Sequence, residues 1–455
     1  MNKNRWSAQV TAGLLLAVAA GNLSCTRPAP YGAPYGLASR IETQAYLHMP
    51  PLAVGKIPLR LSETGVFSDT PNLIPSAGLI PYELIVSFWS DGAAKSRWVA
   101  VPRGKIGFAP TGEWSFPAGT VFVKTFDLPT DGADPSIKRR LETRLLVRDS
   151  AGGVYGVVYK WRKDGSDADL LSRSETEDIA IRSANGEVHR QTWYYPSRKD
   201  CMTCHTAGAG GVLGVKTRQL NRRFTYPSGV TDNELRAWNH IGLFDPGLKD
   251  GEPAALPALA AADDASRALE DRARSYLDAN CSQCHRPGGT VAAFDTRFDT
   301  PLDAQGLIDA PVLIDEGIDR PRVISPHDIW RSIAYMRVNT TGDIKMPPLA
   351  RETIDQRGLQ LLNAWITGMP GRSVLSPPVM SPPGGSYHAP VEVSLTMSEP
   401  GAEIRYTLDG SAPGKTDALY EKPIKLTQTA VLRARSYKDG FTRSITEQQV
   451  FLIEK

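Results

Sequence analysis

Residues 281–285 read Cys-Ser-Gln-Cys-His, and residues 201–205 read Cys-Met-Thr-Cys-His. Each motif places two thiols three positions apart, with an imidazole directly after the second. A zinc site built from two cysteine pairs usually separates the pairs by about 15–20 residues, far less than the separation here. Isolated disulfides or a redox-active Cys-x-x-Cys would leave both histidines unexplained. The repeated motif therefore indicates a covalently attached cofactor.

The spacing is the one that attaches c-type haem, in which two thiols add to the two vinyl groups of one porphyrin. The adjacent His then ligates the iron, and its other ring nitrogen should donate to a carbonyl group, which fixes the tautomer. We therefore predict two covalently bound c-type haems. Their attachment and iron-binding residues are Cys201, Cys204 and His205 in the first motif, and Cys281, Cys284 and His285 in the second.

The second iron has a candidate for its other axial ligand. Met346 follows His285 by 61 positions and precedes two prolines, whose fixed φ angles stiffen the loop that would present the thioether. We predict that Met346 ligates this iron. With both axial positions filled, this haem would pass electrons and would not easily bind a substrate.

The other axial ligand of the first iron stays open. No Met lies between the two motifs, and the only His there is His240. Three arrangements remain: ligation by His240, ligation by a Met from elsewhere in the chain (Met336 or Met49), or an iron with an open or weakly held position.

The N-terminus has the features of an export signal. A basic start precedes an apolar run over residues 11–20, which is too short for the roughly 20 residues that span a bilayer. We expect a signal peptide over residues 1–25 and a Pro-, Gly- and Tyr-rich linker over residues 26–50. Residues 22–25 (Asn-Leu-Ser-Cys) resemble a bacterial lipobox, although Asn stands where Leu, Val or Ile is usual. Cys25, the odd one of five cysteines, would then carry lipid; ordinary cleavage near Ala20 is the alternative.

Hydropathy patterns divide the remaining chain. Alternating apolar and polar residues predict an all-β domain over 51–195, followed by a first haem region over 196–265. An apolar stripe of helical period occurs within 266–372, which we expect to form the domain of the second haem. A Pro-rich linker over 373–385 and a β-sandwich over 386–455 complete the chain. The expected fold is multidomain: an N-terminal all-β domain, a central α-helical, cytochrome c-like di-haem region and a C-terminal immunoglobulin-like β-sandwich.

Two resemblances accompany these patterns. Residues 51–370 resemble a family of bacterial di-haem c-type cytochromes with an N-terminal β domain, on the evidence of Leu61-Ser-Glu-Thr-Gly-Val-Phe67, Phe88-Trp-Ser-Asp-Gly92 and Tyr195-Pro-Ser197. The tail resembles the immunoglobulin-like domain at the C-termini of chitobiase-type proteins, through residues 404–413 and 432–440. The second resemblance implies an accessory or spacer role.

Composition and motifs together predict a function. Hydrophobic residues make up 41% and charged residues 22% of the chain, which excludes general disorder and a multi-span membrane protein; the net charge gives no reason to expect nucleic acid. We expect an exported di-haem c-type cytochrome, in the periplasm or on the outer membrane. It would carry electrons from an exported dehydrogenase to another cytochrome or an oxidase. A peroxidase- or oxidase-like haem enzyme with an open first iron is the alternative, and a surface adhesion or carbohydrate-binding protein is a third possibility.

Overall fold

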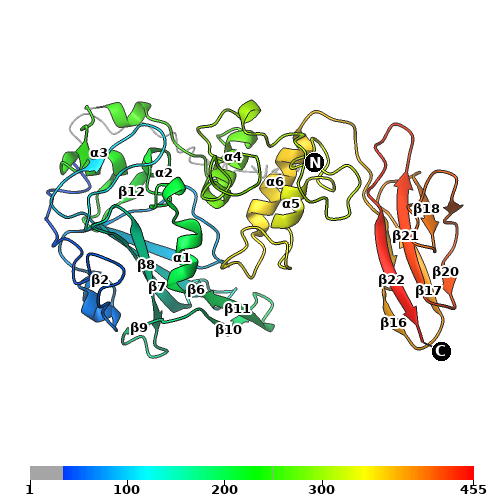
Figure 1. The fold of residues 1–455 in the computed structure, drawn as a ribbon, viewed down its shortest axis with the longest axis horizontal. Helices are drawn as coiled ribbons and strands as arrows, with labels where there is room; N and C mark the ends of the chain where they lie inside the picture. Colours follow the sequence, from blue (N-terminus) through cyan, green and yellow to red (C-terminus); the bar gives the residue numbers. More distant parts are fainter. Residues whose placement is uncertain (1–33, 250, 455) are drawn as a thin grey trace, which may run out of the picture. The chain divides into compact units, whose positions relative to one another are not determined.

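A six-stranded antiparallel sheet organises the N-terminal part of the computed structural model, which describes residues 34–249 and 251–454. Its strand order is β3-β4-β6-β7-β8-β9, and Figure 1 labels β6, β7, β8 and β9 of this sheet. The strands are β3 (Leu79–Pro81), β4 (Ala94–Ala100), β6 (Val121–Pro129), β7 (Lys138–Arg148), β8 (Val154–Trp161) and β9 (Ala168–Leu170). The alternating pattern of the sequence thus forms the expected all-β domain.

The two faces of this sheet pack against different parts of the chain. Successive side chains of a strand point to opposite faces. Val121, Val123 and Leu145 face a cluster that contains Met49. Phe122 lies on the other face, in a cluster shared with residues 212–244. The segment after the first Cys-x-x-Cys-His motif is therefore part of the fold of the β domain.

Short paired strands surround the large sheet. They are β1 (Phe67–Asp69) with β2 (Ile74–Pro75), β5 (Ile106–Gly107) with β14 (Phe244–Asp245), β10 (Glu175–Arg182) with β11 (Val188–Tyr195), and β12 (Arg223–Thr225) with β13 (Thr231–Asn233). The pair β5 and β14 is parallel and joins positions more than 130 residues apart. It fixes the end of the segment that carries the first motif against the β domain.

Six α-helices occur in the described residues. The first three are α1 (Arg198–Cys204), α2 (Thr217–Leu220) and α3 (Glu234–His240), and the last three are α4 (Leu269–Cys281), α5 (Ile333–Val338) and α6 (Gln356–Gly368). Helix α4 packs on α6 around Tyr276, Leu277 and Trp365. No helix of the described residues combines the length and the apolar character that crossing a membrane requires.

The expectation of a central α-helical, cytochrome c-like region was wrong. The described chain is mainly β, and four of its six helices have seven residues or fewer. Helical periodicity in the sequence is confined to the segments that became α4 and α6. The intervening residues 282–332 are mostly turns and irregular backbone, with one short 3₁₀ helix at Leu302–Ala304. The predicted helical region also included Pro-, Gly- and Asp-rich segments, which do not form helices.

The C-terminal part contains two small sheets that enclose one core, as expected for an immunoglobulin-like sandwich. One sheet has β15 (Val379–Ser381), β17 (Val391–Thr396) and β20 (Ile424–Leu426). The other has β16 (Gly385–Tyr387), β22 (Glu447–Ile453), β21 (Ala430–Tyr437), β18 (Glu403–Thr407) and β19 (Ala418–Leu419). Val393, Leu432 and Phe451 are fully buried between them.

The predicted signal peptide and Cys25 lie outside the described residues. From residue 34 onward the chain forms one compact unit. Part of the expected linker packs on the β domain: Leu47 and Met49 are buried, and the backbone N–H of Tyr46 donates to the carbonyl of Gly119 at 2.9 Å.

Candidate functional site

The first Cys-x-x-Cys-His motif lies on helix α1. Ser197 caps this helix: its hydroxyl accepts from the backbone N–H of Asp200, whose carboxylate accepts from the backbone N–H of Ser197 at 2.8 Å. Cys201 and Cys204, three positions apart, share one face of the helix. This face rests on β8, where a Cβ at Gly156 would lie 2.9 Å from the Sγ atom of Cys201. The missing side chain of Gly156 therefore lets α1 approach the sheet closely.

The imidazole of His205 has a fixed orientation. Its Nδ1 atom lies 2.8 Å from the carbonyl oxygen of Gly211. Because a carbonyl can only accept, Nδ1 carries the proton and the lone pair lies on Nε2. Burial lowers the pKa of His205 to about 4, so the ring is neutral near pH 7. The expectation that this His donates to a carbonyl is confirmed.

The second motif lies at the end of α4. Cys281 is the last residue of the helix, and the backbone N–H of His285 donates to its carbonyl at 2.9 Å. The imidazole of His285 stacks on Phe294 with ring centroids 4.2 Å apart. Its Nδ1 atom lies 3.5 Å from the hydroxyl of Thr290. Here a hydroxyl takes the place of the carbonyl that was expected.

The fold brings the two motifs together. The thiols of Cys204 and Cys284 lie close enough for each to be the largest influence on the pKa of the other. All four cysteines of the motifs are free thiols in this structure. No local pattern in the sequence indicates that these positions, 80 residues apart, lie close together.

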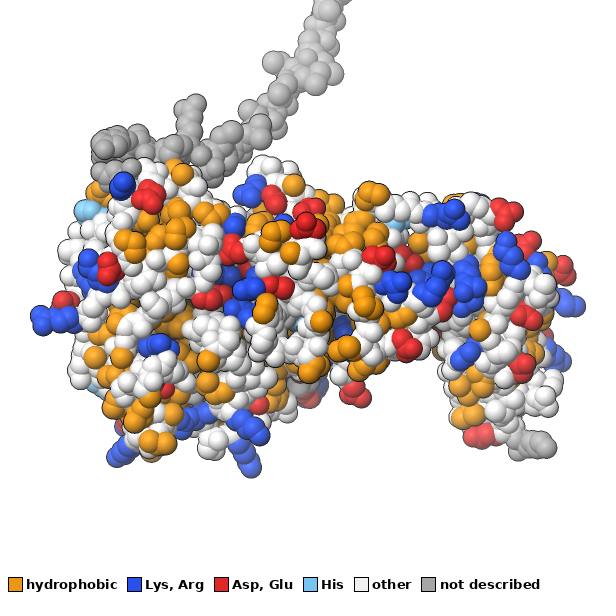
Figure 2. Space-filling view, turned by 45° about the horizontal axis from the view of Figure 1, so that its top comes forward, with side chains coloured by type: hydrophobic (Ala, Val, Ile, Leu, Met, Phe, Trp, Pro, Cys, Tyr) orange, Lys and Arg blue, Asp and Glu red, His pale blue; other side chains and the backbone are white. Residues whose placement is uncertain are grey.

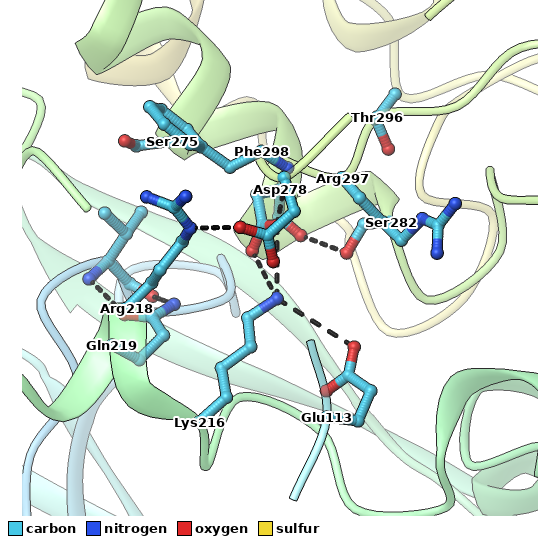
Figure 3. Close-up of polar contacts among 12 residues, drawn as sticks. Glu113, Lys216, Arg218, Gln219, Ser275, Asp278, Ser282, Thr296, Arg297 and Phe298 are labelled. Carbon is cyan, nitrogen blue, oxygen red and sulfur yellow. Dashed lines mark hydrogen bonds and ion pairs between the residues drawn. The ribbon is translucent and has the colours of Figure 1, made fainter. Parts of the chain in front are cut away.

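A buried polar network, drawn in Figure 3, holds the two motif segments against each other. The ammonium of Lys216 lies 2.9 Å from Oδ1 of Asp278 on α4, and the other oxygen of Asp278 accepts from the backbone N–H of Phe298 at 2.9 Å. Glu113 pairs with Arg286, directly after the second motif, at 3.0 Å, and lies 3.9 Å from Lys216. The network connects the β domain, the segment after the first motif and the helix before the second.

A cavity opens beside the first motif. Cys201, Cys204 and His205 all contribute to its wall. Much of the remaining wall is apolar, namely Leu84, Val86, Phe88, Phe122, Leu145, Leu146, Val212, Leu213 and Val215. The second motif contributes Ser282 and Gln283. The cavity is therefore a largely apolar space that both motifs reach.

Four cationic side chains of the sheet also line this cavity: Lys95, Arg97, Lys124 and Arg144. Burial lowers the pKa of Lys95 to about 7 and that of Lys124 well below its usual value. On the outer face drawn in Figure 2, by contrast, acidic and basic side chains are intermixed. Sequence reasoning missed this group of cations, although Phe122, Lys124 and Phe126 alternate along one strand and so had to share a face.

The structure does not bring His240 to this cavity. His240 is exposed, and its ring stacks on Tyr35 with centroids 3.5 Å apart. Met49, another candidate for the first iron, is buried in the cluster on the opposite face of the sheet.

Met346 lies in the loop after α5. Its backbone N–H donates to the carbonyl of Arg337 at 2.9 Å. Burial, and to a lesser extent the charge of Arg337, lower the pKa of His285. Ligation by Met346 therefore stays a prediction. Met336 lies on α5 and is partly buried. In the part of the chain that the structure describes, no group of three or more His, Cys, Asp or Glu side chains could hold a metal ion.

Comparison with known proteins corrects the sequence-based classification. No curated protein matches the chain. The described chain is mainly β, and the family model that matches covers only the tail. The predicted membership in the family of bacterial di-haem c-type cytochromes was therefore wrong, and so was the description of the chain as a cytochrome c. The tail alone agrees with its expected resemblance: residues 382–447 are similar to the chitobiase/beta-hexosaminidase C-terminal domain.

Proposed function

We propose that the protein is an exported electron carrier in which each Cys-x-x-Cys-His motif attaches one haem. This proposal rests on the chemistry of the two motifs and does not require the family or the helical fold that were predicted. The observation that carries it is that Cys201, Cys204 and His205 line one cavity whose wall also includes Ser282 and Gln283 of the second motif. Bound haem supplies one-electron chemistry at its iron.

The residues around the first motif fit such a group. Cys201 and Cys204 lie on one helix face at the edge of a largely apolar cavity. His205, in the same wall, is neutral and keeps the Nε2 lone pair available, which is the state in which imidazole binds iron. Gly211 holds the ring in place through Nδ1, as second-shell partners of metal-bound histidines do.

The arrangement favours passage of electrons between two sites. Two groups attached through neighbouring thiols would have their attachment edges close together, so that an electron could cross from one to the other without leaving the protein. The polar network around Lys216 and Asp278 would keep this distance fixed. The partners would be an exported donor, such as a dehydrogenase, and an acceptor such as another cytochrome or an oxidase.

A haem enzyme is the second candidate, and one observation favours it. The described residues that line the cavity include a single imidazole, that of His205, and no thioether. An iron held there would have one axial position open to a small molecule such as peroxide. Carbon monoxide binding to the reduced protein separates the two functions: an electron carrier with saturated irons does not bind it, whereas an open first iron does.

Export and lipid attachment at Cys25 remain part of the proposal. Attachment would leave the mature protein in the membrane fraction, extractable by detergent. A mature N-terminus upstream of Cys25 with an unmodified thiol would contradict it. Because a single acyl chain binds membranes only marginally, stable attachment requires more than one chain.

Intact-mass measurement tests the central proposal. The full chain, produced with haem-maturation machinery, should carry two covalent haems. The variants Cys201→Ala/Cys204→Ala and Cys281→Ala/Cys284→Ala should each carry one. A wild-type chain with no covalent haem, or with zinc instead, would refute the proposal.

A further inference from the structure

Three of the cavity cations form a row across neighbouring strands. Lys124 on β6 is directly opposite Arg97 on β4 and directly opposite Arg144 on β7. Like charges placed directly opposite each other destabilise a sheet. A negative charge near Arg97, Lys124 and Arg144 would therefore reduce the repulsion among these side chains.

The protein itself supplies only part of that charge. Arg97 forms an ion pair with Glu83, and Arg144 pairs with Glu142 at 2.5 Å. Lys95, the fourth cation, donates to the carbonyl of Phe88 at 2.8 Å. Four basic side chains thus lie beside two carboxylates, and burial without an acidic partner lowers the pKa of both Lys95 and Lys124.

Lys124 is the cation with the fewest partners. In the described part of the chain its ammonium contacts the ring of Phe126, 5.2 Å from the ring centroid, and no hydrogen bond or ion pair is found for it. Burying a charge is costly unless it is paired. Burial therefore lowers the pKa of Lys124 in the chain alone, and an anion beside the ammonium would favour its charged form.

The other acids near the cavity are already engaged. Asp278 pairs with Lys216, and Glu113 pairs with Arg286. Asp200 accepts from Ser197 and from the hydroxyl of Tyr194. Asp91 accepts from the backbone of Glu352 and Thr353. None of these acids is thus free to pair with Lys124.

The position of the row relative to the motif identifies that partner. Cys201 stands over Gly156 on β8. Arg144, Lys124 and Arg97 follow on the next three strands, in register with Val158, two residues along β8 from Gly156, and neighbouring strands lie about 4.8 Å apart. A porphyrin bonded to the motif through its vinyl edge carries two propionate carboxylates at the opposite edge. Within the row Arg97 and Arg144 already have carboxylate partners, so a propionate would supply the carboxylate that Lys124 lacks.

We propose that the row of Arg97, Lys124 and Arg144 binds the two propionate carboxylates of the haem attached to Cys201 and Cys204. This inference rests on the proposed function. In this arrangement the cation row orients the porphyrin over the sheet. Lys124 is a positioning residue: it contacts a propionate carboxylate and does not ligate the iron.

The test is a redox titration of the loaded full-length protein and its Lys124→Met variant, after intact mass has established the number of covalent haems. A cation beside the propionates favours the reduced iron, so its removal should lower the midpoint potential of one haem without changing the haem count. Lys124→Arg, which keeps the charge, should restore most of the potential. Lys138→Met is the matched control, because Lys138 is exposed at the start of β7.

The possible outcomes separate the inference from the proposed function. A wild-type chain without covalent haem refutes both. Two covalent haems with the same potentials in Lys124→Met and Lys138→Met refute only the propionate inference. If Lys124→Met does not fold, Lys124→Gln takes its place with the same expected shift. Added phosphate provides a last check. If it changes the midpoint potential of the wild-type protein but not that of Lys124→Met, the row binds a free anion, and the inference is refuted.

Discussion

The ammonium group of Lys216 lies 2.9 Å from the carboxylate of Asp278, and both side chains are almost completely buried, with 6% and 3% of their surfaces exposed. Lys216 follows the first motif and Asp278 precedes the second. This ion pair therefore connects the two segments that the proposed electron transfer needs close together.

Replacing Lys216 with Met should destabilise the protein strongly. The carboxylate of Asp278 would remain buried without a cation, which typically costs about 3–5 kcal/mol. Urea unfolding measures the change. The double variant Lys216→Met/Asp278→Leu should recover part of the loss, because both charges are then removed. Lys415→Met, in an exposed pair with Asp439, should change stability by about 1 kcal/mol or less. Equal effects at the two lysines would show that the buried pair has no special role.

Gly156→Ala should separate α1 from the sheet. The added Cβ would lie 2.8 Å from the Cβ and 2.9 Å from the Sγ atom of Cys201, so the helix must shift. Overpacking of this kind typically costs about 1–3 kcal/mol, and attachment at the first motif should become less complete. Intact mass and urea unfolding measure both effects. Gly368→Ala, in a helix and with no atom near the new Cβ, is the control and should be neutral or slightly stabilising.

Met346→Ala tests the predicted axial ligand of the second iron. If the thioether ligates, the variant should lose the absorption band of thioether-to-ferric-iron ligation while the haem stays covalently attached. The potential of that haem should fall, since Met/His ligation raises it, and the reduced protein should gain carbon monoxide binding. Met336→Ala, on the nearby α5, serves as the comparison. Loss of the band in Met336→Ala and its retention in Met346→Ala would reverse the assignment.

Lys95 should make the stability of the haem-free chain depend on pH. Burial, aided by Arg97 and Arg144, lowers its pKa to about 7, whereas an unfolded Lys titrates near 10.4. Between these values the unfolded state holds more protons, so the free energy of unfolding should rise as the pH increases from about 7 to about 10. Urea unfolding across this range should show a smaller slope for Lys95→Met than for wild type.

Two further measurements check the origin of this slope. Lys138→Met should keep the wild-type slope, because Lys138 is exposed and remote from the cavity cations. In the haem-loaded protein the slope should weaken, since propionates near the cation row would raise the pKa of Lys95. If the free energy of unfolding depends on pH equally in Lys95→Met and in wild type, a group other than Lys95 causes the pH dependence.

Local patterns in the sequence predicted the elements of this protein more reliably than their assembly. Alternation over residues 121–126 and 141–147 predicted strands that the structure contains as β6 and β7. The tail was correctly expected to be a β-sandwich. The prediction of an extended helical region was wrong because helical periodicity at 269–277 and 354–366 does not continue through the residues between them, which apart from α5 and one short 3₁₀ helix are mostly turns and irregular backbone.

The sequence by itself determined the chemistry of the two motifs, because the order of two thiols and an imidazole is a local property of five residues. Only the tertiary structure decided what surrounds them. The proximity of Cys204 to the second motif depends on which segments line one cavity, and the cation row depends on the pairing register of three strands. Alternation assigns each residue to a face of its own strand, but register alone determines which residues of neighbouring strands become neighbours. Long-range packing likewise placed His240 on the surface and left His205 in the wall of the cavity.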